Sequence, residues 1–352
     1  MGFVKKNHLV GLDIGSSVIK AAEIQQSKKG NYLKRFGMAA VAPGAIADGR
    51  IMDMRQVAQT IDTLFQFQKI REKNVALSVG GPSVMIKTIH IPNLPEKELT
   101  QIIAAEAVQY LPWEIEQVHI DYQILGESEF SSDQVTVLVA AVRKDLVAQY
   151  TGAAAMAGLN ARIVDVDTFA LHNIYQTLPD RDPDDMTLLL DVGASKTSLN
   201  IFHDDISLLI RANGSGTFQI IEEIAARFET DARHAEKILQ APVADAPDPE
   251  ILASILQEAA DFWCSDIADA VHPFLARTRD ARITRTVLSG GGSHIQALSD
   301  RLKGELGADV HIIRPFEGLN MDDTKFSSTV KSQVGPQAAV VLGLALRRLD
   351  DK

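Results

Sequence analysis

The sequence predicts an α/β fold made of two similar halves that face each other. Residues 8–24 (HLVGLDIGSSVIKAAEI) have the pattern of a strand, a tight turn and a second strand. Residues 187–201 (TLLLDVGASKTSLNI) repeat this pattern, with Asp191 in the position that Asp13 occupies in the first copy. A repeat at this scale indicates two related halves. In a third segment, a short strand at 285–289 runs into three glycines and a helical pattern, which is typical of an α/β unit.

The first turn has the composition of a phosphate-binding loop. A glycine lets backbone N–H groups approach a ligand closely, and successive N–H groups of such a turn attract an anion. An adjacent carboxylate can hold a hydrated Mg²⁺, which needs few protein ligands. Lys20 either pairs with a phosphate oxygen or faces solvent on its strand. The predicted residues are Gly15, Ser16 and Ser17 for the phosphate and Asp13 for the metal ion.

The second turn and the glycine run extend this prediction to the other half. A glycine run before a helix N-terminus suits an anion, or a sugar and base packed against bare backbone, although a βα loop without a ligand has the same composition. The two hairpin turns, one from each half, would hold the phosphates of one nucleotide between them. The predicted residues are Asp191 for the metal ion, and Gly193, Ala194, Ser195, Lys196, Thr197, Gly290, Gly291, Gly292 and Ser293 for the nucleotide.

The composition is that of a globular protein with an acidic surface. The 352 residues are enough for two domains, and 46% are hydrophobic and 23% charged. The net charge of −11 argues against a broad nucleic-acid surface and against general adhesion to anionic lipid. The single cysteine, Cys264, cannot form an internal disulfide, which favours a reducing compartment. It lies in an apolar helical pattern, which favours a buried, inert thiol.

The chain carries no recognisable signal for export or membrane insertion. Residues 1–7 lack an apolar signal core, and no apolar run approaches the ~20 residues that span a bilayer. No Cys/His cluster has the spacing of a zinc site. We therefore expect a cytoplasmic protein whose attachment to a membrane, if it has one, runs through a partner.

Strand and helix patterns divide the chain into four predicted parts. Residues 83–164 show the succession strand, helix, strand, strand, helix, strand, which predicts a compact inserted α+β module. Pro273 is expected to kink or end a long helix, and Gly335-Pro336 to start the last one at Gln337, because proline is favoured at the first helical position. The predicted parts are 1–82 with 165–185 and 336–352, 83–164, 186–216 with 281–335, and 217–280.

These motifs, in this order, resemble those of the actin/Hsp70/hexokinase-like ATPase superfamily. Within it, the chain resembles the PilM family of type IV pilus assembly proteins, relatives of the cell-division protein FtsA. The segments that carry this likeness are KTIHIPNLPEKEL, EAVQYLPWEIEQVHIDYQIL, AVRKDLVAQY and PQAAVVLGLALR. The resemblance implies an actin-like (ribonuclease H-like) two-domain ATPase fold. Its four parts would be subdomain 1A, an inserted α+β subdomain 1C, and subdomains 2A and 2B.

The resemblance also implies ATP and Mg²⁺ as ligands. Glu236 and Lys237 lie in the helical segment whose acidic and basic residues contact ribose or adenine in the superfamily, and a solvated helix face explains them equally well. Asp167 or Thr168 is explained as the N-cap of the connecting helix, although the carboxylate could also approach the cleft. Ser198 stands where actin has a histidine, and no clear counterpart of the water-orienting residue is present. We therefore expect slow or absent ATP hydrolysis.

The implied function is that of a cytoplasmic ATP-binding adaptor of the type IV pilus inner-membrane platform, peripheral to the inner membrane through partners. Its expected partner is the cytoplasmic tail of a PilN-like membrane protein, received near the inserted module. Other platform and motor proteins and self-association into a homo-oligomer are also compatible with the resemblance.

Three alternatives stay open: an FtsA-like filament-forming ATPase, a small-molecule kinase of the same fold, and a pseudo-ATPase scaffold. The chain ends at Asp350-Asp351-Lys352 directly after the last predicted helix, without the amphipathic membrane helix of FtsA. No aspartate base with a polar substrate pocket stands out for a kinase.

Overall fold

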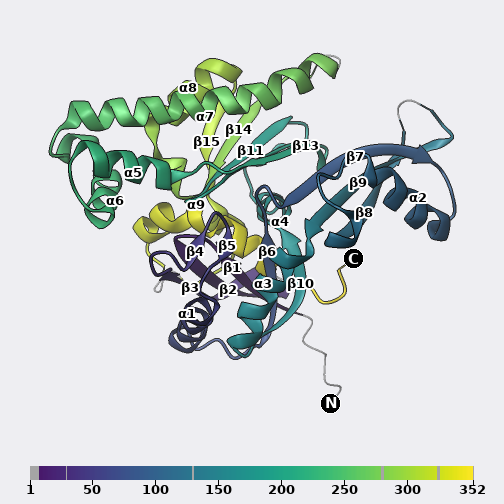
Figure 1. Ribbon diagram of the computed structural model, residues 1–352, viewed down its shortest axis with the longest axis horizontal. Helices are drawn as coiled ribbons and strands as arrows, with labels where there is room; N and C mark the ends of the chain where they lie inside the picture. Colours follow the sequence, from purple (N-terminus) through teal and green to yellow (C-terminus); the bar gives the residue numbers. More distant parts are fainter. Residues whose placement is uncertain (1–7, 29, 129–130, 279–280, 323–325, 352) are drawn as a thin grey trace.

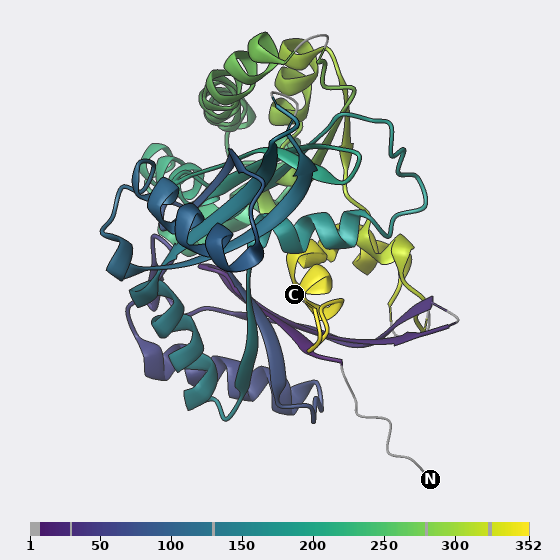
Figure 2. The same ribbon diagram turned by 90° about the vertical axis from the view of Figure 1, so that its right-hand side faces the viewer.

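Two five-stranded sheets form the two halves of the molecule, and a third, three-stranded sheet projects from the first half (Figure 1 and Figure 2). Residues 1–7, for which we predict no signal core, lie outside the described part of the chain. Among the described residues, no helix combines the length and the apolar character needed to cross a bilayer. The computed structural model describes residues 8–28, 30–128, 131–278, 281–322 and 326–351.

The first sheet has the strand order β10-β6-β1-β2-β3. β1 and β2 form the predicted hairpin, in which Asp13 lies opposite Lys20, and β6 and β10 run parallel to β1 and to each other. Successive residues of a strand point to opposite faces. Ala21 therefore lies in a core with α1 and α3, and Ala22 in a core with α4 and α9. The elements are β1 (Val10–Ile14), β2 (Val18–Ser27), β3 (Gly30–Ala40), β4 (Ile46–Ala47), β5 (Arg50–Ile51), α1 (Met54–Phe67), β6 (Asn74–Val79), α3 (Lys144–Met156), β10 (Asn160–Val166), α4 (Asp167–Tyr175) and α9 (Ser328–Ala345).

The second sheet repeats the first with the order β13-β12-β11-β14-β15. β11 and β12 form an antiparallel hairpin, and β14 runs parallel to β11, which confirms the internal repeat. Cys264 is buried in the core of this half, as predicted, and α7 continues through Pro273, so that this proline does not end the helix. The elements are β11 (Thr187–Val192), β12 (Thr197–His203), β13 (Ile206–Asn213), α5 (Thr217–Arg227), α6 (Ala232–Gln240), α7 (Pro249–Arg277), β14 (Arg285–Ser289), α8 (Gln296–Leu306) and β15 (Asp309–Ile312).

The inserted sheet consists of β7, β9 and β8, in this order, with α2 packed on one face through Leu99 and Ile103. The prediction of a six-element module is wrong for its last two elements. β10 pairs with β6, which satisfies its backbone groups in the first sheet, and α3 packs on the same sheet through Leu146. The other predicted boundaries between parts of the chain stay predictions. The elements are β7 (Val84–Pro92), α2 (Glu96–Val108), β8 (Val118–Glu127) and β9 (Gln134–Arg143), and short 3₁₀ turns occur at Ile115–Gln117, Val243–Asp245, Gly291–His294 and Pro315–Gly318.

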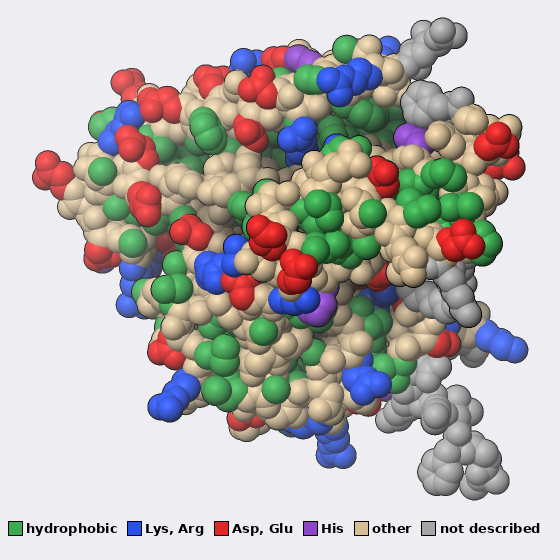
Figure 3. Space-filling model, turned by 45° about the vertical axis from the view of Figure 1, so that its right-hand side comes forward, with side chains coloured by type: hydrophobic (Ala, Val, Ile, Leu, Met, Phe, Trp, Pro, Cys, Tyr) green, Lys and Arg blue, Asp and Glu red, His purple; other side chains and the backbone are tan. Residues whose placement is uncertain are grey.

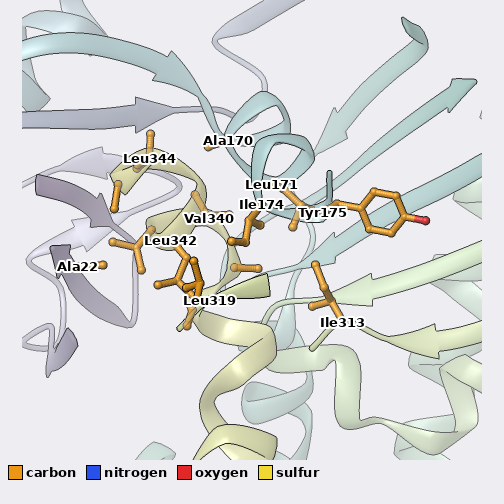
Figure 4. Packing of buried hydrophobic residues seen from close by; sticks show 14 of the residues in the cluster. Ala22, Ala170, Leu171, Ile174, Tyr175, Ile313, Leu319, Val340, Leu342 and Leu344 are labelled. Atoms are coloured by element: carbon orange, nitrogen blue, oxygen red, sulfur yellow. The ribbon is translucent and has the colours of Figure 1, made fainter. Parts of the chain in front are cut away.

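One hydrophobic core joins the two halves. It contains α4, α9 and residues of both large sheets, among them Ala22 and Phe202. In Figure 4 the side chains of Ile174 and Val340 lie next to each other, between α4 and α9. The prediction that the last helix starts at Gln337 is wrong, because α9 begins at Ser328 and Pro336 lies inside it. A proline lacks the N–H that donates to the preceding turn of a helix, but its φ angle fits the helix. The Pro336 carbonyl accepts 3.0 Å hydrogen bonds from the Gly290 N–H and the Ser289 hydroxyl, which tie α9 to the end of β14.

A close approach of α4 and α9 requires glycine at position 343, since a Cβ atom there would overlap the carbonyl oxygen of Ala170. We expect Gly343→Ala to lower the free energy of unfolding by roughly 3 kcal/mol, measured by urea denaturation. Gly304→Ala is the matched control, because nothing lies within 4 Å of its added Cβ on α8. The control should leave stability unchanged or raise it by up to about 1 kcal/mol. Equal stability of Gly343→Ala and the wild type would contradict this packing.

Candidate nucleotide site

A cleft of about 1060 Å³ lies between the two halves, and both hairpin turns open onto it. β1 and β11 end at this cleft, and the carboxyl ends of strands in α/β sheets are where ligands bind. Its size suits an organic ligand. The predicted residues that line it are Asp13, Gly15, Ser16, Ser17 and Lys20 from the first half, and Asp191, Gly193, Ala194, Ser195, Lys196, Glu236, Gly290 and Gly291 from the second.

Four other predicted residues are not among those that line the cleft. The hydroxyl groups of Thr197 and Ser293 are buried and donate 2.8 Å hydrogen bonds to backbone carbonyls. Gly292 is buried, and Lys237 is exposed on α6. Thr197, Gly292 and Ser293 lie beneath the cleft surface, where they support the turn after β11 and the glycine run after β14. Direct contact of these four residues with a nucleotide stays a prediction.

Lys20 forms an ion pair with Asp13 at 2.8 Å. The pairing of β1 with β2 places these two residues opposite each other, so the hairpin register itself creates the pair. The Lys20 side chain is only 13% exposed and lines the cleft, which rules out the alternative of a strand lysine that faces solvent.

Lys196 forms an ion pair with Asp167, the first residue of α4. The prediction of Asp167 or Thr168 as the N-cap is wrong, because Val166 holds the cap position and the Asp167 carboxylate points into the cleft. Burial of the Lys196 ammonium opposes its charged form. The Asp167 carboxylate beside it outweighs burial and raises the pKa of Lys196 above its usual range. Lys196 is therefore cationic at every physiological pH.

The two turns also touch each other across the cleft. The hydroxyl groups of Ser16 and Ser195 lie 2.7 Å apart and share a hydrogen bond. The N–H group of Gly193 donates to the carbonyl of Lys196 at 2.9 Å, which closes the second turn. The Gly193 N–H is therefore engaged within its own turn, and a phosphate there would have to compete with this bond.

Asp191 adds a carboxylate to the part of the cleft where the two ion pairs lie. Burial of its carboxyl group raises the pKa of Asp191 to about 6, and the negative charge of Asp167 adds to the shift. A Cβ atom at Gly290 would lie 2.9 Å from an Asp191 oxygen, so the glycine run lies directly against this carboxylate. Asp13, Asp167 and Asp191 thus outnumber the two lysines in this part of the cleft, and an added cation would relieve the repulsion.

These residues fit a hydrated Mg²⁺ better than a directly coordinated metal ion. Among the residues that the structure describes, no group of three or more His, Cys, Asp or Glu is placed to hold a metal. Mg²⁺ keeps several waters and is commonly held by one or two carboxylates plus substrate phosphates. Asp13 and Asp191, one from each half, would supply these carboxylates.

Gly49, Gly80 and Tyr150 are among the cleft-lining residues that the sequence patterns do not identify. Gly80 directly follows β6, which runs parallel to β1, so its place at the carboxyl end of a strand was a usable signal. Tyr150 lies on α3 and Gly49 at the tip of the β4–β5 hairpin. No local pattern connects these two, and only the tertiary fold brings them to the cleft.

Comparison with known proteins agrees with this geometry. The family described as "Type IV pilus assembly protein PilM" matches residues 11–349. A chain of the solved "PilM-PilN type IV pilus biogenesis complex" superposes with a TM-score of 0.86 at 28% identity, covering 98% of this chain and 99% of that chain. The ethanolamine utilization protein EutJ from Carboxydothermus hydrogenoformans superposes with a TM-score of 0.55 at 12% identity, covering 98% and 91%, a likeness of fold alone. The predicted actin-like two-domain α/β fold is confirmed.

The raised pKa of Asp191 makes stability depend on pH. Between its ordinary pKa of 3.8 and about 6, the unfolded chain loses the proton before the folded chain does, so stability falls as pH rises through this window. Without nucleotide, Asp191→Asn should be more stable than the wild type by about 2 kcal/mol at pH 8 and equally stable near pH 4. Urea denaturation across this range tests it. A difference that is constant with pH would contradict the assignment.

Proposed function

We propose that this chain, which belongs to the family of type IV pilus assembly proteins PilM, is a nucleotide-gated adaptor of the inner-membrane assembly platform of a type IV pilus. ATP with Mg²⁺ would bind between the two halves. The cytoplasmic tail of a PilN-like membrane protein would bind at the inserted sheet. Each half presents to the cleft a hairpin turn and a lysine paired with a carboxylate, and this geometry carries the nucleotide part of the proposal.

Lys20 and Lys196 are placed to bind phosphate groups. In the structure each ammonium neutralises one carboxylate of the cleft, Asp13 or Asp167. Phosphate oxygens make strong charge-assisted hydrogen bonds with ammonium groups and can replace these carboxylates as partners. The freed Asp13, together with Asp191, would then face the hydrated metal ion. Mg²⁺ bound there would neutralise phosphate charge.

The far end of the cleft suits the nucleoside part of the ligand. It is lined by the apolar side chains of Leu239, Val243 and Leu256, with Glu236 among them. Apolar walls with a few polar groups are the usual surroundings of a base and a ribose. Glu236 would accept a hydrogen bond from a ribose hydroxyl or an amino group of the base.

Slow or absent turnover accords with the same geometry. Ser198 is buried in β12 and is not among the residues that line the cleft. Hydrolysis requires a group that orients the attacking water. Ser198, which stands where actin has a histidine, does not reach the cleft and cannot supply that group, so we favour a protein that responds to bound nucleotide over a rapid ATPase.

The inserted sheet and α2 carry exposed apolar side chains suited to a short protein segment. Val108 is 53% exposed, Tyr110 40% and Ile124 46%. Such side chains bury apolar area when a partner segment binds. In Figure 3, acidic and basic side chains are interspersed, and Lys and Arg do not gather into one extended patch on the face shown. A protein tail therefore suits this surface better than a nucleic acid does. Binding to a membrane protein's tail would hold the chain at the cytoplasmic side of the inner membrane.

Lys20→Met and Lys196→Met should weaken ATP binding. Each removes one charge-assisted hydrogen bond to phosphate, so we expect roughly a 10- to 100-fold rise in Kd, measured by titration calorimetry with Mg²⁺. Lys303→Met is the matched control, since Lys303 is exposed on α8 and does not line the cleft, and its Kd should stay within about twofold. Unchanged affinity in both cleft variants would exclude these lysines as phosphate ligands.

Val108→Asp and Ile124→Asp should weaken capture of a synthetic peptide with the sequence of the PilN-like tail. Burying a charge in place of an apolar side chain should raise the Kd by roughly tenfold or more, measured by fluorescence anisotropy. Ile206→Asp is the control, because Ile206 is similarly exposed (36%) but lies on β13. Equal binding by all variants would place the tail elsewhere, and no binding by the wild type would reject this partner.

A further inference from the structure

The inserted sheet is joined to the first half by two chain connections, and the first of them touches the cleft. This connection follows β6 and includes Gly80 and Ser83. Gly80 lies directly against the Asp167–Lys196 ion pair, since a Cβ atom there would overlap the Asp167 carboxylate. A change in that ion pair therefore changes what Gly80 packs against, at a point only four residues before β7 begins.

The second connection, from β9 to α3, is held by a carboxylate that serves two arginines. Arg143, the last residue of β9, donates two hydrogen bonds to Asp145, both of 2.9 Å. Arg50 of the β4–β5 hairpin donates to the same carboxylate at 2.9 Å. Hydrogen bonds from Arg143 and Arg50 hold the pKa of Asp145 well below its usual range, so the shared carboxylate stays ionised. The N–H of Arg143 also donates to the Ser83 carbonyl at 3.2 Å, which ties the two connections together.

The tip of the same hairpin lies at the cleft. The Tyr150 hydroxyl, on α3, donates to the Gly49 carbonyl at 2.9 Å, and both residues line the cleft. Asp48 and Gly49 have φ angles of 49° and 72°, the left-handed conformation typical of a tight two-residue hairpin turn. At the base of the hairpin, Ile46 and Ile51 are buried in the core that also contains α1 and α3. The tip of the hairpin therefore lies at the cleft, and its Arg50 lies at the connection between β9 and α3, where the inserted sheet ends.

We propose that the β4–β5 hairpin couples occupancy of the cleft to the position of the inserted sheet, through Gly49 and Tyr150 at one end and Arg50, Asp145 and Arg143 at the other. This inference rests on the proposed function, because it requires a nucleotide in the cleft. The charges of Lys196 and Asp167 act on Tyr150, which holds the hairpin tip. A phosphate that draws Lys196 away from Asp167, or a ligand that contacts Gly49, therefore changes the surroundings of this tip. α3 carries both Tyr150 and Asp145, so it passes the change to β9. Such coupling is reciprocal: a partner on the inserted sheet would alter nucleotide affinity by the same factor.

Hydrogen–deuterium exchange on the full chain tests the coupling, with saturating Mg-ATP as the probe. In the wild type, ATP should change the exchange rates of amides in 46–51 and 134–143 by about twofold or more. Arg50→Gln should abolish the change in 134–143 while its ATP affinity, measured by calorimetry, stays within about threefold. Tyr150→Phe removes a single oxygen atom and should abolish the same change when each variant is saturated with ATP.

Arg227→Gln is the matched control, because it breaks ion pairs with Glu223 and Glu258 in the helical part of the second half. It should keep the wild-type response. A response at 134–143 that survives in both Arg50→Gln and Tyr150→Phe would overturn the hairpin route. ATP binding to the wild type without any response there would overturn the coupling and leave the proposed function intact. Absence of ATP binding would overturn both.

Discussion

The ion pair between Lys196 and Asp167 holds the second half of the molecule against the helix that follows the first sheet. A charge withdrawn from water is tolerated only when it is paired and hydrogen-bonded. The Asp167 side chain is 7% exposed, so its charge requires the partner that Lys196 supplies. Once they are paired, the hairpin turns of the two halves are close enough for Ser16 and Ser195 to share a hydrogen bond, and position 80 has no room for a side chain. This contact and the core formed by α4 and α9 together hold the two halves in this arrangement.

The charges of the cleft connect its stability with its proposed use. Two carboxylates are neutralised by lysines of the same chain, whereas Asp191 has no such partner and its pKa rises to about 6. Ionisation of Asp191 destabilises the fold, so a cation that binds beside this carboxylate would stabilise the folded protein. When a nucleotide binds, its phosphates would pair with the lysines, and the metal ion would pair with the carboxylates that the lysines leave.

The cleft and the inserted sheet are linked through the first half of the molecule, which borders the cleft and carries the inserted sheet. α4 and α9 contribute to a single core that contains residues of both large sheets, so any movement between the halves repacks that core. The inserted sheet leaves the first half at Gly80, which lies against the ion pair of the cleft, and returns at Arg143. Arg143 contacts Asp145, which Arg50 joins to the hairpin whose tip lines the cleft. Short connections therefore join the cleft to the sheet that we propose as the partner surface.

The sequence by itself determined the two hairpins, the glycine run, the internal repeat and the family, because turns and strand periodicity are short-range features that few residues encode. Most of the residues predicted for the site do line the cleft, since strand ends converge in an α/β fold, and their contact with a nucleotide stays a prediction. Only the tertiary structure decided that Lys196 meets Asp167, that β10 and α3 belong to the first sheet, and that α9 continues through Pro336. It alone joins Arg50 to Asp145, which are 95 positions apart. These outcomes depend on which distant groups satisfy one another's charges and hydrogen bonds, and no local pattern contains that information.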